Sequence, residues 1–143
     1  MQFLEKLKPL GLLVLRIAVG GIFMYHGFPK LFGDPARSVR AFAKFGFPGY
    51  LAYLAGILEL FGGGLLIVGL FTRGAALLLA IEMGVAVARV HVPASGIYAL
   101  SKYEFPLLLG AAALALATTG AGLISMDAFT FESRRKPGKK GNG

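Results

Sequence analysis

The residues of this chain that could do chemistry are ionisable side chains set inside long apolar stretches. Glu59 is the only charged residue between positions 50 and 71, and Glu82 and Arg89 share the apolar stretch 74–92. An ionisable group at the middle of a bilayer costs roughly 2.5–3.5 kcal/mol on insertion scales, so such groups normally face the protein interior and find a partner. Carboxylates and imidazoles held there can exchange protons with a ligand. The pattern therefore predicts a polar site inside a hydrophobic protein.

The amino-acid composition of the chain indicates whether water or lipid surrounds the protein. The 143 residues are 56% hydrophobic and only 15% charged, with a mean hydropathy of +0.70. A soluble domain of this size needs more polar residues to cover its surface. We therefore expect the bilayer to contact much of the protein, and the composition argues against a soluble enzyme.

Several kinds of chemistry are excluded by residue type. The chain has no cysteine, which removes disulfides, thiol nucleophiles and thiolate metal sites, and its two histidines cannot make a three-histidine metal site. We expect no metal. The net charge of +8 on a hydrophobic chain is typical of cytoplasmic ends and of contacts with anionic lipids, so we expect membrane lipids and no nucleic acid as partners.

The apolar stretches predict the elements that position the site. Each has about 19–22 residues, enough for a helix to cross a hydrocarbon core about 30 Å thick. Backbone groups in lipid must satisfy their own hydrogen bonds, which favours helices. The sequence thus predicts an all-α fold, a transmembrane four-helix bundle. Its spans are Leu10–Phe28, Tyr50–Phe71, Gly74–Val92 and Phe105–Ile124.

Two segments outside the spans are distinctive. Asp34 followed by Pro35 predicts the start of a short helix between spans one and two. Arg37, Arg40 and Lys44 would share one of its faces, which is typical of an amphipathic helix in the membrane interface, although an ordinary solvated helix fits equally well. We divide the chain into a membrane domain at 1–131 and a disordered basic tail at 132–143.

Loop charges predict the orientation. Four spans place both termini on one side of the membrane, and that side collects eight basic residues: Lys6, Lys8, Arg73, Arg134, Arg135, Lys136, Lys139 and Lys140. The other side has five: Lys30, Arg37, Arg40, Lys44 and Lys102. The positive-inside rule then places both termini in the cytoplasm.

Depth along the spans sorts the ionisable residues into two groups. Arg16 and Glu82 lie roughly 9 Å and 12 Å from the cytoplasmic end, which predicts a structural ion pair between them. The outer half collects the candidates for ligand binding or proton handling, namely His26, Lys30, Glu59, Arg89, His91, Tyr103 and Glu104. Two structural alternatives stay open: Glu59 pairs with Arg89, or His26 or Lys30 reaches out to the headgroups.

At several of these residues the chain resembles the DoxX family of small bacterial membrane proteins. The resemblance covers about residues 12–129. Its motifs are His26–Gly33, Glu59–Gly63 continuing through Gly69–Arg73, His91, Tyr103–Leu108, Gly120–Gly122 and Ser125–Asp127. It implies a four-helix bundle in the bacterial cytoplasmic membrane, with several membrane spans. It also implies a link to redox systems, because the family is named for its likeness to a subunit of a thiosulfate:quinone oxidoreductase.

Three functions are compatible with these features. The first is an accessory membrane subunit of a quinone-linked or oxidative-stress oxidoreductase system, with soluble oxidoreductase subunits as partners and a lipophile such as a quinone in the outer-half pocket. The second is a small-molecule binder or transporter, and the third is a membrane scaffold for soluble enzymes. No haem, flavin or nicotinamide motif is recognisable, which favours an accessory subunit over an enzyme acting alone, with no covalently bound cofactor. The oligomeric state stays open.

Overall fold

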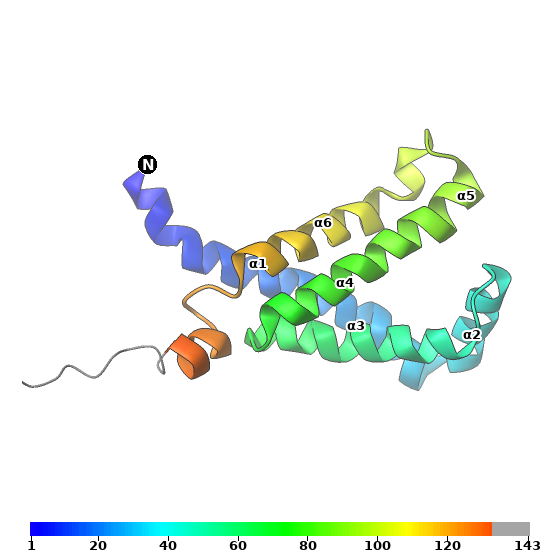
Figure 1. The fold of residues 1–143 in the computed structure, drawn as a ribbon, viewed down its shortest axis with the longest axis horizontal. Coiled ribbons are helices and arrows are strands. Elements are labelled where there is room, and N and C mark those ends of the chain that lie inside the picture. Colours follow the sequence, from blue (N-terminus) through cyan, green and yellow to red (C-terminus); the bar gives the residue numbers. More distant parts are fainter. Residues whose placement is uncertain (133–143) are drawn as a thin grey trace, which may run out of the picture.

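The computed structural model describes residues 1–132, and within them it contains helices joined by turns (Figure 1). The predicted basic tail lies, apart from its first residue, outside the described residues. The elements are α1 Gln2–Phe28, η1 Pro29–Gly33, α2 Pro35–Lys44, α3 Tyr50–Val68, α4 Thr72–Ala86, η2 Val87–His91, α5 Val92–Ser95, η3 Leu100–Lys102, α6 Glu104–Thr119 and η4 Ala128–Glu132.

The long helices alternate in direction. In Figure 1, α1 runs beside α3 and α4 runs beside α6, while the N-terminus and the orange C-terminal segment lie at the same end of the bundle. We call this the termini end, and the opposite end, which holds α2 and α5, the pocket end. The all-α fold predicted from the sequence is confirmed.

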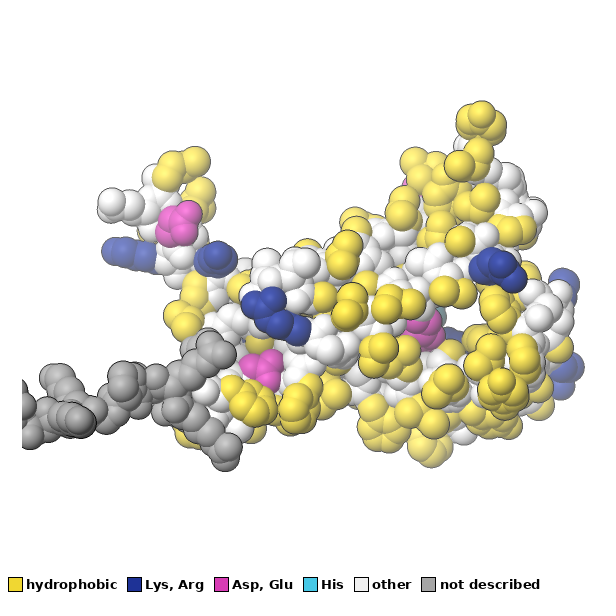
Figure 2. All heavy atoms as spheres, in the orientation of Figure 1, with side chains coloured by type: hydrophobic (Ala, Val, Ile, Leu, Met, Phe, Trp, Pro, Cys, Tyr) yellow, Lys and Arg dark blue, Asp and Glu magenta, His cyan; other side chains and the backbone are white. Residues whose placement is uncertain are grey.

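Three segments are long and apolar enough to cross a membrane, namely Gln2–Gly33, Tyr50–Val68 and Thr72–Ser95, and α6 is a shorter apolar helix of 16 residues. Large apolar side chains face outward along these helices; Leu108, for example, is 71% exposed. Figure 2 shows hydrophobic side chains over much of the visible surface, with Lys and Arg mostly toward the two ends. An apolar exterior of this extent is typical of a surface in contact with lipid.

The interior is small and tightly packed. Phe23 from α1, Leu66 from α3, Leu79 from α4 and Leu116 from α6 are buried at its centre. Helices α1 and α3 cross at glycines, because a Cβ on Gly63 would lie 2.5 Å from the carbonyl oxygen of Gly20. Small residues allow this close approach of helices in membranes.

The predicted fourth span is too long by five residues. Helix α6 ends at Thr119 rather than Ile124, because Gly120 adopts a φ of +79° and Gly122 a φ of +81°. Positive φ angles stop the helix and are cheap only for glycine. The chain therefore turns back, and the segment 120–127 packs against the turn between α3 and α4.

The short helix α2 forms as predicted. The Asp34 carboxylate accepts a hydrogen bond of 3.0 Å from the backbone N–H of Arg37, which satisfies one free donor of the first turn. Val39 and Phe42 are half-buried on the inner face, whereas Arg37 and Arg40 are exposed.

Candidate functional site

The candidate site is built around Glu59, a carboxylate buried in the middle of α3. Only 4% of its surface is exposed. The α1 residue that faces it is Gly27, where a Cβ would lie 2.6 Å from the backbone nitrogen of Leu60 and 2.8 Å from the Cβ of Glu59. The missing side chain at Gly27 therefore lets α1 pass directly over Glu59.

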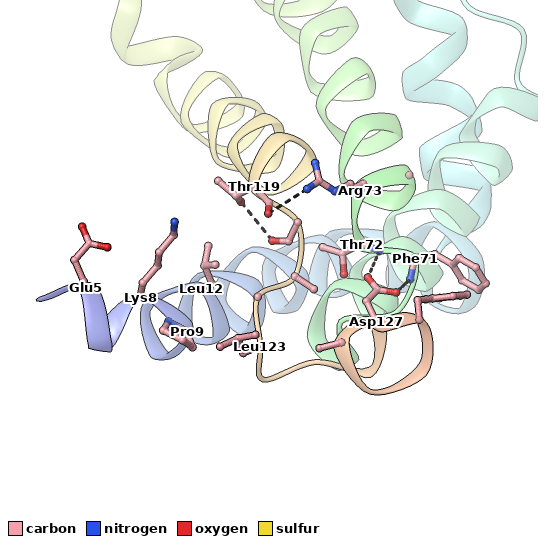
Figure 3. A pocket seen from close by; sticks show the side chains of 16 residues that line it. Glu5, Lys8, Pro9, Leu12, Phe71, Thr72, Arg73, Thr119, Leu123 and Asp127 are labelled. Carbon is pink, nitrogen blue, oxygen red and sulfur yellow. Dashed lines mark hydrogen bonds between the residues drawn. The ribbon is translucent and has the colours of Figure 1, made fainter. Parts of the chain in front are cut away.

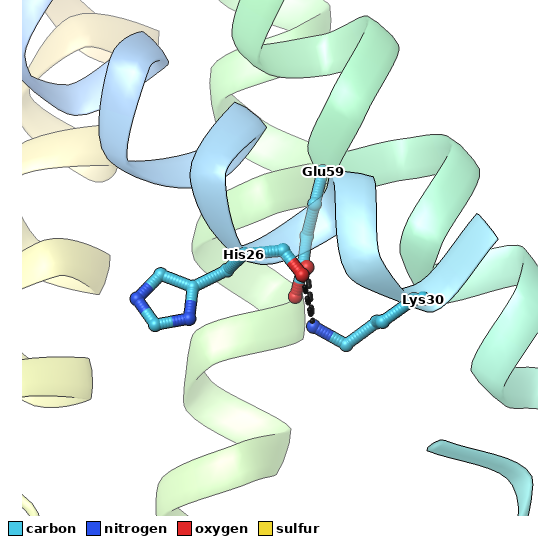
Figure 4. A network of polar contacts seen from close by, with 3 residues as sticks. All are labelled: His26, Lys30 and Glu59. Atoms are coloured by element: carbon cyan, nitrogen blue, oxygen red, sulfur yellow. Dashed lines mark hydrogen bonds and ion pairs between the residues drawn. The ribbon is translucent and has the colours of Figure 1, made fainter. Parts of the chain in front are cut away.

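Lys30 neutralises this carboxylate. Its Nζ lies 2.5 Å from Oε2 of Glu59 and also donates a hydrogen bond of 3.0 Å to the carbonyl oxygen of His26. In Figure 4 the His26 carbonyl faces the Lys30 ammonium, while the His26 ring points the other way. The possible Glu59–Arg89 pair is thus not formed, because Lys30 takes that place and the Arg89 side chain is exposed.

Two π-helical turns border this cluster. Pro29 lacks a backbone N–H, and the helix widens there into η1, in which the Asp34 N–H donates to the carbonyl oxygen of Pro29. The second turn, η2, carries His91, whose Nδ1 lies 2.9 Å from the carbonyl oxygen of Ala86. The widened turns thus carry Lys30 and His91, which both line the same cavity.

A cavity of about 180 Å³ adjoins the cluster. Four predicted site residues line it together with aromatic and apolar side chains. They are His26, Lys30, Glu59 and His91, accompanied by Phe23, Met83, Ala86, Phe105, Pro106 and Leu109. The His26 ring lies beside that of Phe105, with a centroid distance of 5.8 Å and an angle of 49° between the ring planes. We call this cavity the inner pocket.

The other predicted site residues lie elsewhere. Arg89 and Glu104 are exposed. Tyr103 directly precedes α6, and its hydroxyl donates a hydrogen bond to the carbonyl oxygen of Ile97. These three side chains do not line the inner pocket. Within residues 1–132, no three histidine or acidic side chains are grouped to hold a metal ion.

Glu82 joins the site although the sequence placed it elsewhere. The structure does not form the ion pair predicted between Arg16 and Glu82. Glu82 instead lies opposite Glu59, because α4 runs antiparallel to α3 with Leu79 packed against Gly62, one helical turn from each acid. Its Oε2 is buried and finds no N–H or O–H donor among the described residues. Counting depth along isolated helices missed this placement, because it depends on how α3 and α4 pack.

Arg16 has a different and structural role. It is 1% exposed and donates hydrogen bonds to four backbone carbonyl oxygens, those of Leu66 and Ile67 at the end of α3 and those of Ala121 and Ile124 in the returning loop. A cation is favoured there because α3 presents its C-terminal carbonyls. Arg16 therefore ties three segments together.

Asp127 fixes the same returning loop, and we call the hydrogen bonds of Arg16 and Asp127 together the clamp. Its two carboxylate oxygens accept hydrogen bonds from the backbone N–H groups of Phe71 and Thr72, at 2.8 Å and 3.0 Å, and its own N–H donates to the carbonyl oxygen of Gly69. The sequence marked Ser125–Asp127 as a motif without assigning it a task, and the structure shows that Asp127 caps the start of α4.

A larger cavity of about 810 Å³ lies at the termini end (Figure 3). Glu5 and Lys8 project from α1 on one side of it, and Arg73 and Asp127 lie on the other. Arg73 donates to the carbonyl oxygens of Ala117, Thr118 and Thr119, so it caps α6. Charges of both signs line this cavity, and two of the residues that carry them, Arg73 and Asp127, hold the fold together.

The fold and the site define a helical membrane protein with a charged pocket between its helices, in which Glu59 is buried. Comparison with known sequences then identifies the family: the family model DoxX matches residues 11–92, and the chain belongs to the DoxX family. The resemblance noted in the sequence is confirmed.

Named relatives extend over nearly the whole chain. A Bacillus subtilis (strain 168) protein named "Putative oxidoreductase CatD" is 32% identical over 92% of this chain and 96% of its own length. An uncharacterized protein of Haemophilus influenzae is 36% identical over 89% of this chain and 96% of its own length. Inner membrane protein YphA of Escherichia coli (strain K12) is 35% identical over 84% of this chain and 90% of its own length. No solved structure matches the chain.

Proposed function

We propose that this protein is an accessory membrane subunit of a quinone-linked or oxidative-stress oxidoreductase system, and that the inner pocket receives the ring of a quinone-like lipophile. The observation that carries the proposal is the combination, in one cavity, of aromatic walls with a buried carboxylate, an ammonium and an imidazole. The relative named an oxidoreductase supports the redox assignment.

The size of the inner pocket suits a single ring. Sites that enclose a whole drug-sized ligand have about 300–1,000 Å³, whereas a cavity of about 150 Å³ can hold benzene. The inner pocket, at about 180 Å³, therefore fits a head group whose apolar chain lies in lipid. Phe23 and Phe105 would contact the ring faces, and Met83 would fill the remaining apolar side.

The polar residues of the pocket can hold and move protons. A bound quinone supplies redox chemistry in which its oxygens take up protons. Glu59 and His26 present a carboxyl and an imidazole that can exchange a proton with such an oxygen. Lys30 holds the Glu59 carboxylate in one position and offers a positive charge to an oxygen that becomes negative.

Photolabelling tests the proposed occupant. A photoactivatable short-chain benzoquinone should crosslink to peptides that contain Phe23, His26 or Phe105. We expect Ala86→Phe, which fills the pocket, to reduce this labelling by roughly tenfold or more, the effect of about 1.4 kcal/mol of lost binding. Ala115→Phe places the same ring on an exposed face of α6 and should leave labelling unchanged. Equal labelling of the two variants would refute the assignment of the pocket.

The proposal includes an orientation in the bacterial cytoplasmic membrane, with the termini end facing the cytoplasm. It is supported by the excess of basic residues predicted for that side and by the relative named an inner membrane protein. The absence of native cysteine makes the orientation directly measurable.

Thiol labelling of whole cells should distinguish the two ends of the bundle. Ser38→Cys in α2 at the pocket end should react with an impermeant thiol reagent, because the positive-inside rule places this end outside. Gln2→Cys at the start of α1 should react only after the cells are permeabilised. The reverse pattern would show that the protein has the opposite orientation.

A further inference from the structure

Two acids that face one another on α3 and α4, Glu59 and Glu82, have a chemical requirement. Ionised carboxylates only accept hydrogen bonds, so two carboxyl groups can be hydrogen-bonded to one another only when one of them carries a proton. Glu59 also accepts from Lys30, whereas Oε2 of Glu82 has no N–H or O–H donor near it among the described residues. A hydrogen bond between the two facing acids would therefore need a proton of its own.

The charges around the pair lead to the same requirement. Two ionised carboxylates beside a single ammonium would leave one uncompensated negative charge in an apolar surrounding, which is strongly unfavourable. Lys30, on η1, is the cation in contact with the pair. On the other elements, the His26 ring of α1 points away from Glu59, His91 of η2 is bonded to a backbone carbonyl, and α6 lines the pocket with Phe105, Pro106 and Leu109.

We propose that Glu59 and Glu82 hold one proton between them, that Lys30 neutralises the single remaining negative charge, and that this pair is the proton store of the inner pocket. The shared proton follows from the packing of α1, α3 and α4, whereas its delivery to a pocket ligand rests on the proposed function. Glu82, which does not itself line the pocket, acts through Glu59.

Delivery is a simple proton transfer in which no electrons move. The O–H bond of the protonated carboxyl breaks, and a bond from the same proton to a basic atom of the ligand forms. The pair is left with two negative charges beside Lys30, and a proton from water that reaches the pocket restores it. Because the two acids face one another, the proton can leave from Glu59, which lines the pocket, while Glu82 replaces it.

Infrared spectroscopy of the purified full-length protein in lipid nanodiscs tests the shared proton without any ligand. Wild-type protein at neutral pH should show the C=O stretching band of one protonated carboxylic acid, with the small shift in D₂O that marks an exchangeable proton. The control Glu104→Gln removes an exposed carboxylate and should leave the band unchanged. A wild-type spectrum without the band would overturn the proposal.

Variants of the pair separate a shared proton from a single neutral acid. In both Glu59→Gln and Glu82→Gln, the one remaining carboxyl can ionise beside Lys30, so the band should disappear in each. If Glu82 were protonated merely because it is buried, the band would persist in Glu59→Gln. That result would contradict a proton shared between the two acids. Glutamine preserves the shape of the side chain, and thermal unfolding close to that of wild type will confirm that each variant is folded.

Lys30→Met provides the strongest contrast. Without the ammonium, both carboxyls should be protonated, and the band should grow to about twice its wild-type area, as expected from the cost of an unpaired buried charge. An unchanged band would contradict the role given to Lys30. These spectra need no ligand, so the two proposals can fail separately. If the spectra are as predicted but quinone labelling fails, only the proposed occupant is rejected. If quinone labelling succeeds but the predicted bands are absent, only the proton store is rejected.

Discussion

Replacing Arg16 with methionine should cause the largest loss of stability of any single substitution at the termini end. The guanidinium is buried and bonded to four carbonyl oxygens from α3 and from the loop 121–124. A buried acceptor left without its donor costs about 1–3 kcal/mol. Some of these carbonyls can regain water, so we expect a total loss of about 3–5 kcal/mol, similar to breaking a buried ion pair.

Thermal unfolding in detergent, followed by circular dichroism, measures this effect. Arg89→Met is the matched control, because it removes an exposed arginine from a predicted span and should change the unfolding temperature little. Arg16→Lys keeps the charge but cannot reach all four carbonyls, so its loss should be intermediate. An unfolding temperature of Arg16→Met equal to that of wild type would contradict the clamp.

The same measurement distinguishes the clamp from the ion pair predicted by the sequence. If Arg16 were paired with Glu82, removing both charges would restore stability. In the structure the two residues have separate partners, so adding Glu82→Leu to Arg16→Leu should not rescue the protein. Asp127→Asn should instead be non-additive with Arg16→Leu, because both residues hold the same loop.

Adding a side chain at Gly27 should have the largest effect on the inner pocket. Valine at this position would place its Cβ against the Leu60 nitrogen and the Glu59 Cβ, so α1 must move away from α3. The 2.5 Å contact between Lys30 and Glu59 depends on that approach. We therefore expect quinone photolabelling to fall by roughly tenfold or more and the unfolding free energy to fall by about 1–3 kcal/mol, the usual cost of overpacking.

Gly21 provides the matched control on the same helix. Apart from its two chain neighbours and the backbone of its own helix, no atom lies within 4 Å of a Cβ built at Gly21. Gly21→Val should therefore be tolerated, and Gly21→Ala should stabilise the helix by about 1 kcal/mol or less. If the crossing of α1 over Glu59 shapes the inner pocket, Gly27→Val should lose quinone photolabelling and Gly21→Val should retain it. A similar loss in both would mean that any bulk on α1 disturbs the protein, without a special role for the crossing at Glu59.

Periodicity and composition determined much of this architecture. Long apolar stretches predict helices in lipid because the backbone can satisfy its hydrogen bonds there only within the helix. Asp34 with Pro35 likewise predicts the start of α2, because both residues act locally on the first turn. The presence of His26, Lys30, Glu59 and His91 at one site was also foreseeable, since ionisable groups at a similar depth in lipid normally face the bundle interior and pair.

Partner choice among those charges was decided by the tertiary structure. Glu59 pairs with Lys30 because the glycine at position 27 and the π-helical turn at Pro29 bring η1 onto α3. Arg16 donates to backbone carbonyls rather than pairing with Glu82, because Gly120 and Gly122 reverse the chain after α6. The loop that follows α6 therefore lies against Arg16. The depth of a residue within a membrane span follows from its position in the apolar stretch, so the sequence reveals it. Which helix face contacts a neighbouring helix depends on crossing angles and on how loops fold back, and both involve residues far apart in sequence.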